Sequence, residues 1–569
     1  MVDELSTLDL IKRSINSKSN FILEAGAGSG KTYTLIQTLK FLNGYSLKKN
    51  QKILCITYTN VAKNEIIERL QRDQIKDNYV VSTIHDFLWS FFSAFQPELQ
   101  RVVSELARIK VQKIENDIKD AEQKLANPTK RTNIENQTQI VLQGNLKLEK
   151  YENIDYSKLK IRYDKYTALY RGVVSHDEII EIANTFMSND FFVGLLISSF
   201  PYIMIDEYQD SDYNLITNLI TKANQLNLSS KYVLGLFGDK MQQIYQDKEE
   251  LDFSLFDNVI KKTDNYRSSE KIVAANNILR NDSLIQSSEC QGTPIVHENL
   301  KFIYNTSDDV DLNGYLSTGN VIYKRLYLVN RKIAEEVGFG NIAEIFRSKY
   351  HRDVNEKLLK LEDPLLNFIV LDILQDHRSY LDEKYAQIIK RLNVYTLEEL
   401  ENARNAITSL FENIQTSIFS FIEGYRELFV FDQTRYDEII ESYDDLEFTS
   451  SLLSVSVHEF LSLIKQVRGE TELSTMHGVK GQEFPNVIVN VLEEREWNKY
   501  DFPKLILTGD LSLSTTDRAH KLLYVSCTRA QSGLIINYIC EDYSSEMESM
   551  LKDSAIRMFG IDMEFITLK

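Results

Sequence analysis

The sequence predicts an α/β protein with two parallel-sheet cores, each interrupted by a helical insertion. Short apolar runs recur along the chain with turn residues and helical patterns between them, as in buried parallel strands. Two long stretches between these runs have helical spacing and few strand signals. The length of the chain agrees with two cores and two insertions. Because 569 residues are more than a single hydrophobic core usually contains, two to four domains are expected.

The predicted strands fall into two sets. A parallel strand buried on both faces is continuously apolar rather than alternating, and these runs have that character. Two sets of such strands indicate two sheets. The runs are 21–23, 53–56, 202–205 and 233–237 in the first set, and 326–329, 487–489 and 534–536 in the second.

The first insertion is predicted from one apolar stripe. Val111, Ile114, Ile118, Ala121 and Leu125 are spaced three and four apart, and Asn127-Pro128 then breaks the pattern. The second insertion contains apolar helical stretches at 365–374 and 407–422. The predicted boundaries are 1–98 and 176–262 for the first core, 99–175 for its insertion, 263–345 and 462–569 for the second core, and 346–461 for its insertion.

Composition narrows the class of protein. No run is apolar for the length that spans a bilayer, and the N-terminal residues do not have the pattern of a secretory signal, so no membrane association and a cytoplasmic location are expected. The four cysteines have neither CxxC spacing nor a nearby histidine pair, which predicts reduced thiols rather than a zinc site. The net charge of -18 opposes nucleic-acid binding overall, although a local basic groove is compatible with it.

A phosphate-binding loop is predicted between the first strand and a helical pattern. Glycines let backbone N–H groups turn inward around phosphates, Lys31 reaches the β and γ oxygens, and the Thr32 hydroxyl ligates Mg²⁺. The alternative is a glycine-rich turn that happens to contain GKT, since the strict pattern begins with glycine and Ala25 stands there. The loop residues are Ala25, Gly26, Ala27, Gly28, Ser29, Gly30, Lys31 and Thr32.

Two carboxylates follow the predicted strand at 202–205. A hydrolytic site for ATP needs one carboxylate for the metal ion and another that orients and deprotonates the attacking water. Asp206 suits the first role and Glu207 the second. The alternative is a charged strand-to-helix turn. Such a turn would explain a DE pair on its own, but it does not explain well why an apolar strand ends in DEYQD.

With these residues in hand, the sequence resembles the UvrD/Rep/PcrA-type superfamily 1 DNA helicases along nearly its whole length. The resemblance implies two RecA-like P-loop NTPase cores with two helical insertions, ATP and Mg²⁺ as cofactors, and single-stranded or tailed DNA as the partner. The segments that resemble family motifs, in family order, are AGAGSGKT (25–32), ITYTNVAKNEI (56–66), TIHDF (83–87), DEYQD (206–210), GDKMQQIY (238–245), NYRSS (265–269), TMHGVKGQEF (475–484) and YVSCTRA (524–530).

The resemblance also implies residue roles. Arg267 and Arg529 would reach the γ-phosphate from the second core, Gln242 would sense that phosphate, and Glu483 would bind the ribose; a surface ion pair is the ordinary alternative for either arginine. Contacts to DNA would come from hydroxyl, imidazole and aromatic groups, although core packing is an alternative for His85 and Tyr245. The DNA-binding candidates are Thr57, Asn60, His85, Tyr245, Thr475 and His477.

Two departures from the family pattern stand out. Leu10 lies near the position where the family usually carries an adenine-reading glutamine, so that position does not predict adenine selectivity. After Tyr245 the chain has Gln246 to Glu250 where relatives often have a base-stacking tryptophan, which predicts the loss of one stacking platform. With its short second insertion, the chain resembles the helicase-like subunits of bacterial anti-phage systems such as Gabija.

Three functions compete at this point. The first is an ATP-dependent 3′-to-5′ DNA translocase or helicase, whose polarity is implied by the family alone. The second is an ATP-sensing or DNA-end-sensing subunit of a defence complex that gates a partner nuclease. The third is a degenerate scaffold, which the presence of Lys31, Glu207, Arg267 and Arg529 opposes.

Overall fold

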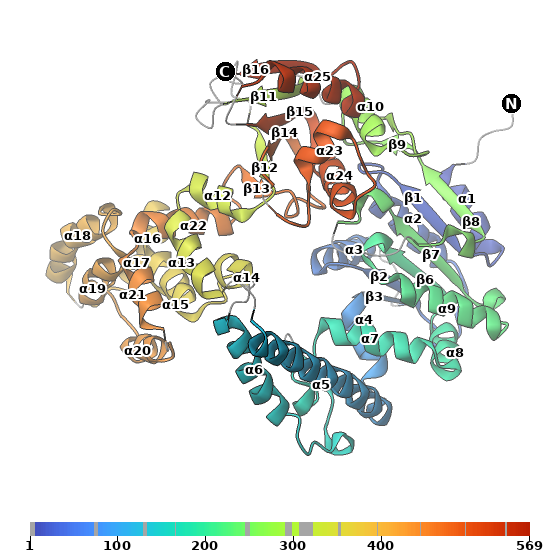
Figure 1. The fold of residues 1–569 in the computed structure, drawn as a ribbon, viewed down its shortest axis with the longest axis horizontal. Helices are drawn as coiled ribbons and strands as arrows, with labels where there is room; N and C mark the ends of the chain where they lie inside the picture. The colour runs from blue at the N-terminus through green and yellow to red at the C-terminus, as the bar shows by residue number, and fades with distance from the viewer. Residues whose placement is uncertain are drawn as a thin grey trace. The chain divides into compact units, whose positions relative to one another are not determined.

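The computed structural model divides the chain into two compact units. The first comprises Met1–Arg267 and Asp282–Gln291, and the second Ser268–Asn281 and Gly292–Lys569. Each is an α/β unit with its own parallel sheet (Figure 1). The structure describes residues 6–72, 78–128, 134–164, 167–244, 251–290, 299–306, 322–350, 354–394, 396–443, 445–495, 497–540 and 543–568.

The first unit is organised around a six-stranded sheet in the order β3-β2-β6-β7-β1-β8, in which every pair is parallel. Its central strands are buried from end to end, because helices cover both faces. The strands are β1 (Phe21–Ala25), β2 (Ile53–Thr57), β3 (Tyr79–Thr83), β6 (Tyr202–Asp206), β7 (Val233–Gly238) and β8 (Asn258–Lys262).

Alternate residues of each strand enter two separate cores. Phe21 and Leu23 pack with α1, α2 and α3 on one face, whereas Ile22 packs with α4, α7, α8 and α9 on the other. The two layers fix the sheet, so the ends of its strands hold polar residues in defined positions. The helices are α1 (Thr7–Asn16), α2 (Lys31–Leu42), α3 (Asn60–Arg72), α4 (Ile84–Phe92), α7 (His176–Met187), α8 (Asp190–Ser199) and α9 (Tyr213–Gln225).

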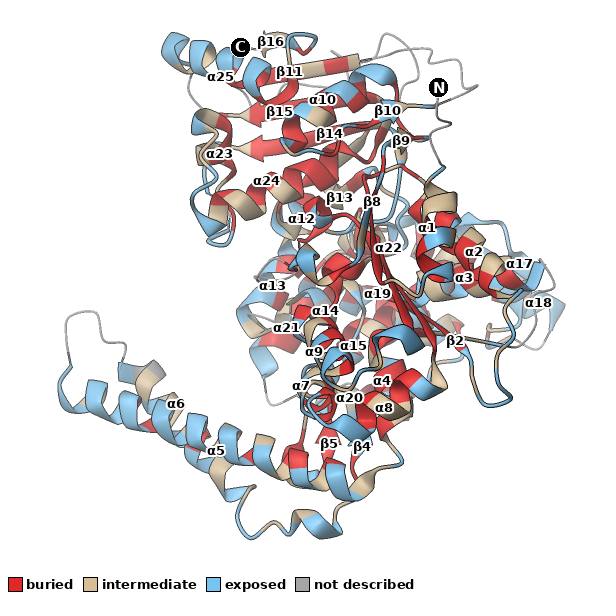
Figure 2. Cartoon of the chain, turned by 90° about the vertical axis from the view of Figure 1, so that its right-hand side faces the viewer, coloured by how far each residue is buried: buried red, intermediate tan, exposed pale blue. Residues whose placement is uncertain are grey.

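The helical insertion of the first unit is a hairpin of α5 (Gln96–Ala126) and α6 (Ile134–Glu149), followed by the short strands β4 (Arg162–Tyr163) and β5 (Val173–Val174). All five residues of the predicted stripe are buried or half-buried, and Ile118 packs against Gly144 of α6. Figure 2 shows that the outer part of the hairpin is largely exposed.

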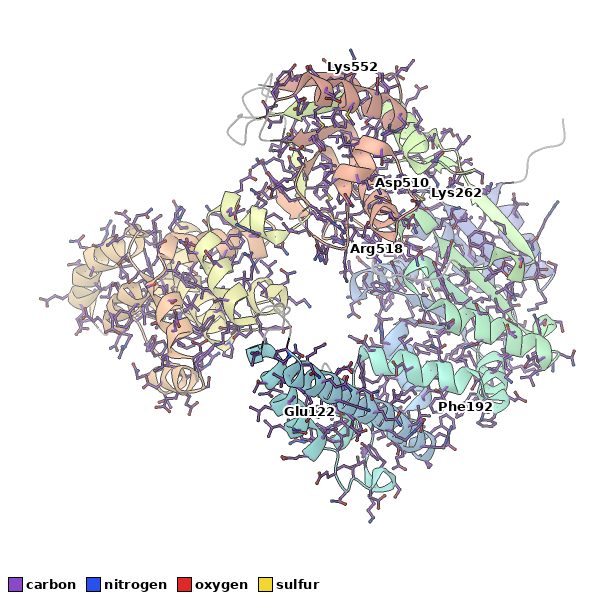
Figure 3. All side chains as sticks on the ribbon, in the orientation of Figure 1. Glu122, Phe192, Lys262, Asp510, Arg518 and Lys552 are labelled. Atoms are coloured by element: carbon purple, nitrogen blue, oxygen red, sulfur yellow. The ribbon has the colours of Figure 1, made fainter. Side chains whose placement is uncertain are left out.

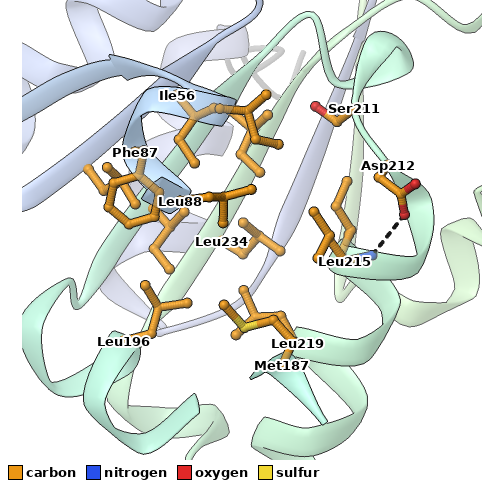
Figure 4. Close-up of a pocket in the computed structure, with 15 residues that line it drawn as sticks. Ile56, Phe87, Leu88, Met187, Leu196, Ser211, Asp212, Leu215, Leu219 and Leu234 are labelled. Atoms are coloured by element: carbon orange, nitrogen blue, oxygen red, sulfur yellow. Dashed lines mark hydrogen bonds between the residues drawn. The ribbon is translucent and has the colours of Figure 1, made fainter. Parts of the chain in front are cut away.

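A small apolar cavity of about 50 Å³ lies inside the first unit, on the face covered by α4, α7, α8 and α9 (Figure 4). Leu88, Met187, Leu196 and Leu234 are among its lining residues, and Asp212 at one edge accepts a hydrogen bond from the backbone of Leu215. Because an apolar lining offers water no partners, this cavity is a packing defect rather than a nucleotide site.

The second unit has a second six-stranded parallel sheet, in the order β13-β12-β14-β15-β11-β16. The long strands β14 and β15 form its centre. The strands are β11 (Asn299–Asn305), β12 (Lys324–Tyr327), β13 (Leu473–Thr475), β14 (Phe484–Leu492), β15 (Ala530–Ile539) and β16 (Glu564–Leu568), and the helices packed with them are α10 (Glu270–Arg280), α12 (Asn330–Val337), α23 (Phe502–Thr508), α24 (Ser514–Cys527) and α25 (Ser545–Phe559).

A helical region interrupts the second sheet between β12 and β13. It has its own aromatic-rich core, and one of its helices contains a π-helical turn at Phe368–Ile373. Its helices are α13 (Gly340–Tyr350), α14 (Val354–Leu359), α15 (Pro364–Asn367), α16 (Leu374–Leu381), α17 (Tyr385–Ile389), α18 (Leu397–Glu412), α19 (Ile418–Leu428), α20 (Gln433–Glu441), α21 (Leu446–Ser454) and α22 (Val457–Val467).

The predicted fold class, two parallel-sheet α/β cores with helical regions, is confirmed. Two segments that were predicted to belong to the second core, residues 263–267 and 282–291, group with the first unit instead. The reason is that β9 (Asp264–Asn265) pairs with β10 (Ser287–Ser288) and its neighbours bond to the loop after β1. Within the described residues, no helix has the length and apolar character needed to cross a membrane.

Candidate nucleotide and nucleic-acid sites

The loop between β1 and α2 has the geometry of an anion cradle. Gly28 and Gly30 both have φ +76°, a left-handed conformation that glycine adopts without strain. Gly30 is the N-cap of α2, whose free N–H groups and dipole favour negative charge at this end. Lys31 is buried, and its Nζ donates to the carbonyl of Ala25 at 3.2 Å. The ammonium group therefore closes the loop over the space where phosphates would bind.

Side chains from a distant part of the chain hold this loop in place. The Nδ2 of Asn265 donates to the carbonyl of Ala27 at 3.0 Å, and the Nε2 of Gln286 donates to the same oxygen at 3.2 Å. The backbone N–H of Tyr266 donates to the carbonyl of Gly28 at 2.9 Å. A Cβ on Gly28 would lie 2.8 Å from Asn265 Oδ1, so no side chain fits there. These bonds occupy loop carbonyls and leave loop N–H groups for a ligand.

The two predicted carboxylates stand at the end of β6, in the same sheet as the loop. Asp206 is 3% exposed, and burial raises the pKa of its carboxyl well above the ordinary value; the charge of Glu207 adds to the rise and Lys31 opposes it. Glu207 has φ +49°, an uncommon conformation for a residue other than glycine. Strain of this kind persists where surrounding structure enforces it, and it is concentrated at functional sites.

A buried hydrogen-bond network connects Glu207 to the segment after β7. Gln209 Nε2 donates to the Glu207 carboxylate, and Gln209 Oε1 accepts from the backbone N–H of Asp239 at 3.1 Å. Asp239 Oδ2 in turn accepts from Gln242 Nε2 at 2.9 Å. Gln209 and Asp239 are fully buried. The candidate general base and the candidate phosphate sensor are thus joined through two intermediate side chains.

The residues present fit a Mg²⁺ ion shared with nucleotide phosphates. Asp206 Oδ1 is buried without a hydrogen-bond partner, as expected for an oxygen reserved for a cation, and Thr32 follows Lys31 on the first turn of α2. Among the described residues there is no group of three or more His, Cys, Asp or Glu that could hold a metal. Mg²⁺ commonly takes only one or two protein carboxylates and completes its shell with phosphates and water.

The remaining nucleotide candidates are divided between the units. Arg267 groups with the first unit, contrary to its predicted place in the second core, and its backbone N–H donates to Asn265 Oδ1 at 3.0 Å. Arg529 belongs to the second unit and is 1% exposed; its guanidinium donates to the carbonyls of Val525 and Gln482. Glu483 is exposed just before β14.

The DNA-binding candidates of the first unit differ in accessibility. Thr57 ends β2 with its hydroxyl buried and unpaired, whereas Asn60 is exposed at the start of α3. His85 packs against the ring of His176, with centroids 4.4 Å apart. Burial, with a smaller contribution from His176, lowers the pKa of His85 to about 4, so its imidazole is neutral at pH 7. Tyr245 lies outside the described residues.

In the second unit, Thr475 is the last residue of β13, and His477 lies in the turn that follows this strand. Thr475 Oγ1 accepts from the backbone N–H of Gly478 at 3.0 Å, which shapes the turn. His477 shares a 2.8 Å hydrogen bond with the hydroxyl of Tyr500, and burial lowers the pKa of His477 to about 4. Both residues are half-buried.

Comparison with known proteins matches family models to both the N-terminal and the C-terminal part of the chain. The UvrD/REP helicase N-terminal domain matches residues 10–249, and the UvrD-like helicase C-terminal domain matches residues 342–541. This chain belongs to the UvrD/Rep helicase family. It is accordingly an enzyme of the ATP-driven DNA helicase class.

Individual relatives of the UvrD/Rep family match over most of the chain. "Gabija protein GajB" from Bacillus cereus is 28% identical, with the alignment covering 96% of this chain and 97% of that protein. "ATP-dependent DNA helicase PcrA" from Staphylococcus aureus is 23% identical over 91% of this chain and 81% of that protein. "ATP-dependent DNA helicase Rep" from Buchnera aphidicola is 22% identical over 91% and 92%.

The family assignment leaves two sequence departures to be located. Leu10 lies on α1 and is half-buried against the apolar core that α1, α2 and α3 form with one face of the first sheet. The segment 246–250, where a stacking tryptophan was missing from the pattern, lies outside the described residues.

Proposed function

We propose that this chain couples ATP hydrolysis at the loop after β1 to translocation on single-stranded DNA. The observation that carries the proposal is the pair of buried Asp206 and half-buried Glu207 at the end of β6, in the same sheet as β1, which precedes the Lys31 loop. Hydrogen bonds through Gln209 and Asp239 link Glu207 to Gln242. Such a connected set can report phosphate cleavage to other parts of the unit. Family membership supports 3′-to-5′ polarity for this movement.

In the proposed reaction, each residue of the nucleotide site has one task. Loop N–H groups and the Lys31 ammonium hold the β- and γ-phosphates, while Thr32 and Asp206 would hold Mg²⁺, which supplies positive charge to the transferring phosphate. Glu207 orients the attacking water and accepts its proton. Gln242 detects the γ-phosphate, and Glu483 contacts the ribose.

Arg267 and Arg529 are proposed to stabilise the charge of the transferring phosphoryl group. Arg529 is held by carbonyl oxygens of its own unit, so a hydrolytic role requires exchange of those bonds for phosphate bonds. Because the phosphate loop and Arg529 belong to different units, turnover would require residues of both units.

The DNA strand is proposed to contact Thr57, Asn60 and His85 of the first unit, together with Tyr245. Thr475 and His477 would contribute from the second unit. Both histidines are neutral at pH 7, so they would serve as hydrogen-bond or stacking partners rather than as cations. Base contacts of this kind are less affected by salt than phosphate contacts.

A second candidate function is an ATP-sensing or DNA-end-sensing subunit that gates a partner nuclease in an anti-phage complex. The observation that favours it is the similarity to "Gabija protein GajB", which extends over nearly the full length of both chains. The two candidates share the ATP site and differ in whether the isolated chain displaces a strand.

Strand displacement by the purified chain separates the two functions. We expect ATP-dependent unwinding of a duplex with a 3′ single-stranded tail, little unwinding of one with a 5′ tail, and none with the Glu207→Gln variant. If ATP turnover rises with DNA ends while no tailed duplex is unwound, the sensing function is supported instead. If DNA leaves turnover unchanged, both proposals are wrong.

A further inference from the structure

The loop that connects β14 to α23 presents a tryptophan beside the predicted DNA-binding turn of the second unit. Trp497 is 40% exposed, and its ring lies 5.8 Å from the ring of His477 and 5.2 Å from that of Tyr500. One part of the indole is thus packed and another part faces solvent.

The aromatic support beneath Trp497 is firmly anchored. Tyr500 is 4% exposed, stacks on Phe502 at 6.3 Å and shares a 2.8 Å hydrogen bond with His477. Phe502 is itself buried at the start of α23. An exposed ring fixed by a buried aromatic cluster loses little side-chain freedom when a ligand stacks on it, so stacking there costs little conformational entropy.

Cationic side chains accompany the indole. Arg495 closes the loop by donating to the carbonyls of Asn498 and Tyr500, the latter at 3.3 Å. The Nζ of Lys499 lies 5.8 Å from the Trp497 ring centroid. Arg518, labelled in Figure 3, comes from α24 and donates to the carbonyl of Lys499 at 3.4 Å. Basic groups next to an exposed aromatic ring are the arrangement that binds single-stranded nucleic acid without sequence preference.

We propose that Trp497 is a stacking platform for a base of single-stranded DNA, with Lys499 and Arg518 contacting the flanking phosphates. The inference rests on the proposed function, because it places the DNA strand beside Thr475 and His477, at the carboxyl end of β13. It supplies a stacking partner to a chain whose segment 246–250 contains no aromatic residue. The cationic contacts come from Lys499 and Arg518 individually, because the sequence of the loop also contains Glu493, Glu494 and Asp501.

Because the chain has few tryptophans, base stacking on Trp497 can be followed by its fluorescence. There are two tryptophans, and the other, Trp89, is half-buried near Tyr163 in the first unit. In a Trp89→Phe variant of the full chain, Trp497 is the sole indole emitter. Titration with oligothymidylate should quench this emission, whereas a backbone of the same length without bases should bind and leave emission nearly unchanged. Fluorescence anisotropy of the labelled strands reports binding in parallel.

Substitution provides an independent measurement. Trp497→Ala should weaken oligothymidylate binding about 5- to 100-fold, and Trp497→Phe should retain most of the affinity. Tyr543→Ala is the matched control, because Tyr543 is 41% exposed in the same unit but stacks on Tyr304 instead; it should bind normally.

The outcomes separate this inference from the proposed function. Strand binding without quenching in the Trp89→Phe variant overturns the stacking role and leaves DNA binding intact. Equal losses for Trp497→Ala on strands with and without bases also overturn it. Absence of strand binding at low salt overturns the proposed function itself.

Discussion

Replacing Gln209 by leucine is expected to slow ATP hydrolysis while leaving the phosphate loop intact. Gln209 is fully buried and uses its side-chain amide to bridge the Glu207 carboxylate and the backbone N–H of Asp239. Leucine has similar volume and no polar atoms, so the change removes both hydrogen bonds and little packing.

The two lost hydrogen bonds have separate effects, one on the stability of the protein and one on the rate of ATP hydrolysis. Loss of the acceptor for the buried Asp239 N–H should reduce the free energy of unfolding by about 1–3 kcal/mol. Loss of the charge-assisted hydrogen bond from Gln209 removes one restraint on the position of the Glu207 carboxylate. A hydrogen bond of that class is worth about 1.5–3 kcal/mol, which corresponds to roughly 10- to 100-fold in kcat.

The assay is steady-state ATP turnover with saturating single-stranded DNA, together with a thermal melt of each variant. Gln243→Leu is the matched control, because Gln243 is also buried but its Nε2 has no hydrogen-bond partner among the described residues; it should turn over ATP at nearly the wild-type rate. A folded Gln209→Leu variant with wild-type kcat would refute the positioning role of Gln209.

Further predictions concern the ends of this network and the effect of pH. Lys31→Ala should abolish ATP binding and turnover, and Glu207→Gln should bind ATP without cleaving it; normal hydrolysis by Glu207→Gln in a phosphate-release assay would contradict its role as the base. Arg267→Ala and Arg529→Ala should each lower turnover by about 10³-fold with ATP affinity largely kept, whereas equal losses of affinity and turnover would indicate ground-state binding. Because the pKa of His477 is lowered in the folded state, the unfolded chain binds a proton that the folded chain does not, and the free energy of unfolding should fall as the pH drops from about 6.5 to 4. His477→Gln should therefore weaken the dependence of Tm on pH in this range. An unchanged dependence of Tm on pH would contradict this prediction.

The sequence predicted those parts of the fold whose pattern is local. Strands β1, β2, β6 and β7 are buried on both faces and therefore appear as continuous apolar runs. Strands near the sheet edges were missed, because β8, with the sequence NVIKK, is exposed at alternate positions, and β13 has only three residues. Their existence depends on pairing with distant segments rather than on their own composition.

The sequence predicted those residues of the candidate site that belong to recognisable motifs, and it did not predict the residues that support them. Lys31, Asp206 and Glu207 were named from the sequence, but the support of the loop by Asn265 and Gln286 was not, since Asn265 lies 238 residues beyond the carbonyl it binds. Trp497 was also missed, because an isolated tryptophan in a polar loop carries no local signal. Its significance depends on the packing of His477 and Tyr500 beneath it.

Coupling between ATP hydrolysis and DNA is tested most directly by ATP turnover of the purified chain with and without single-stranded DNA, over a range of salt concentrations. The account predicts turnover that rises on DNA addition, a stimulation that weakens as salt increases because phosphate contacts release counterions, and no turnover in the Glu207→Gln variant under any condition. Turnover that is indifferent to single-stranded DNA at low salt, or that survives in Glu207→Gln, would contradict it.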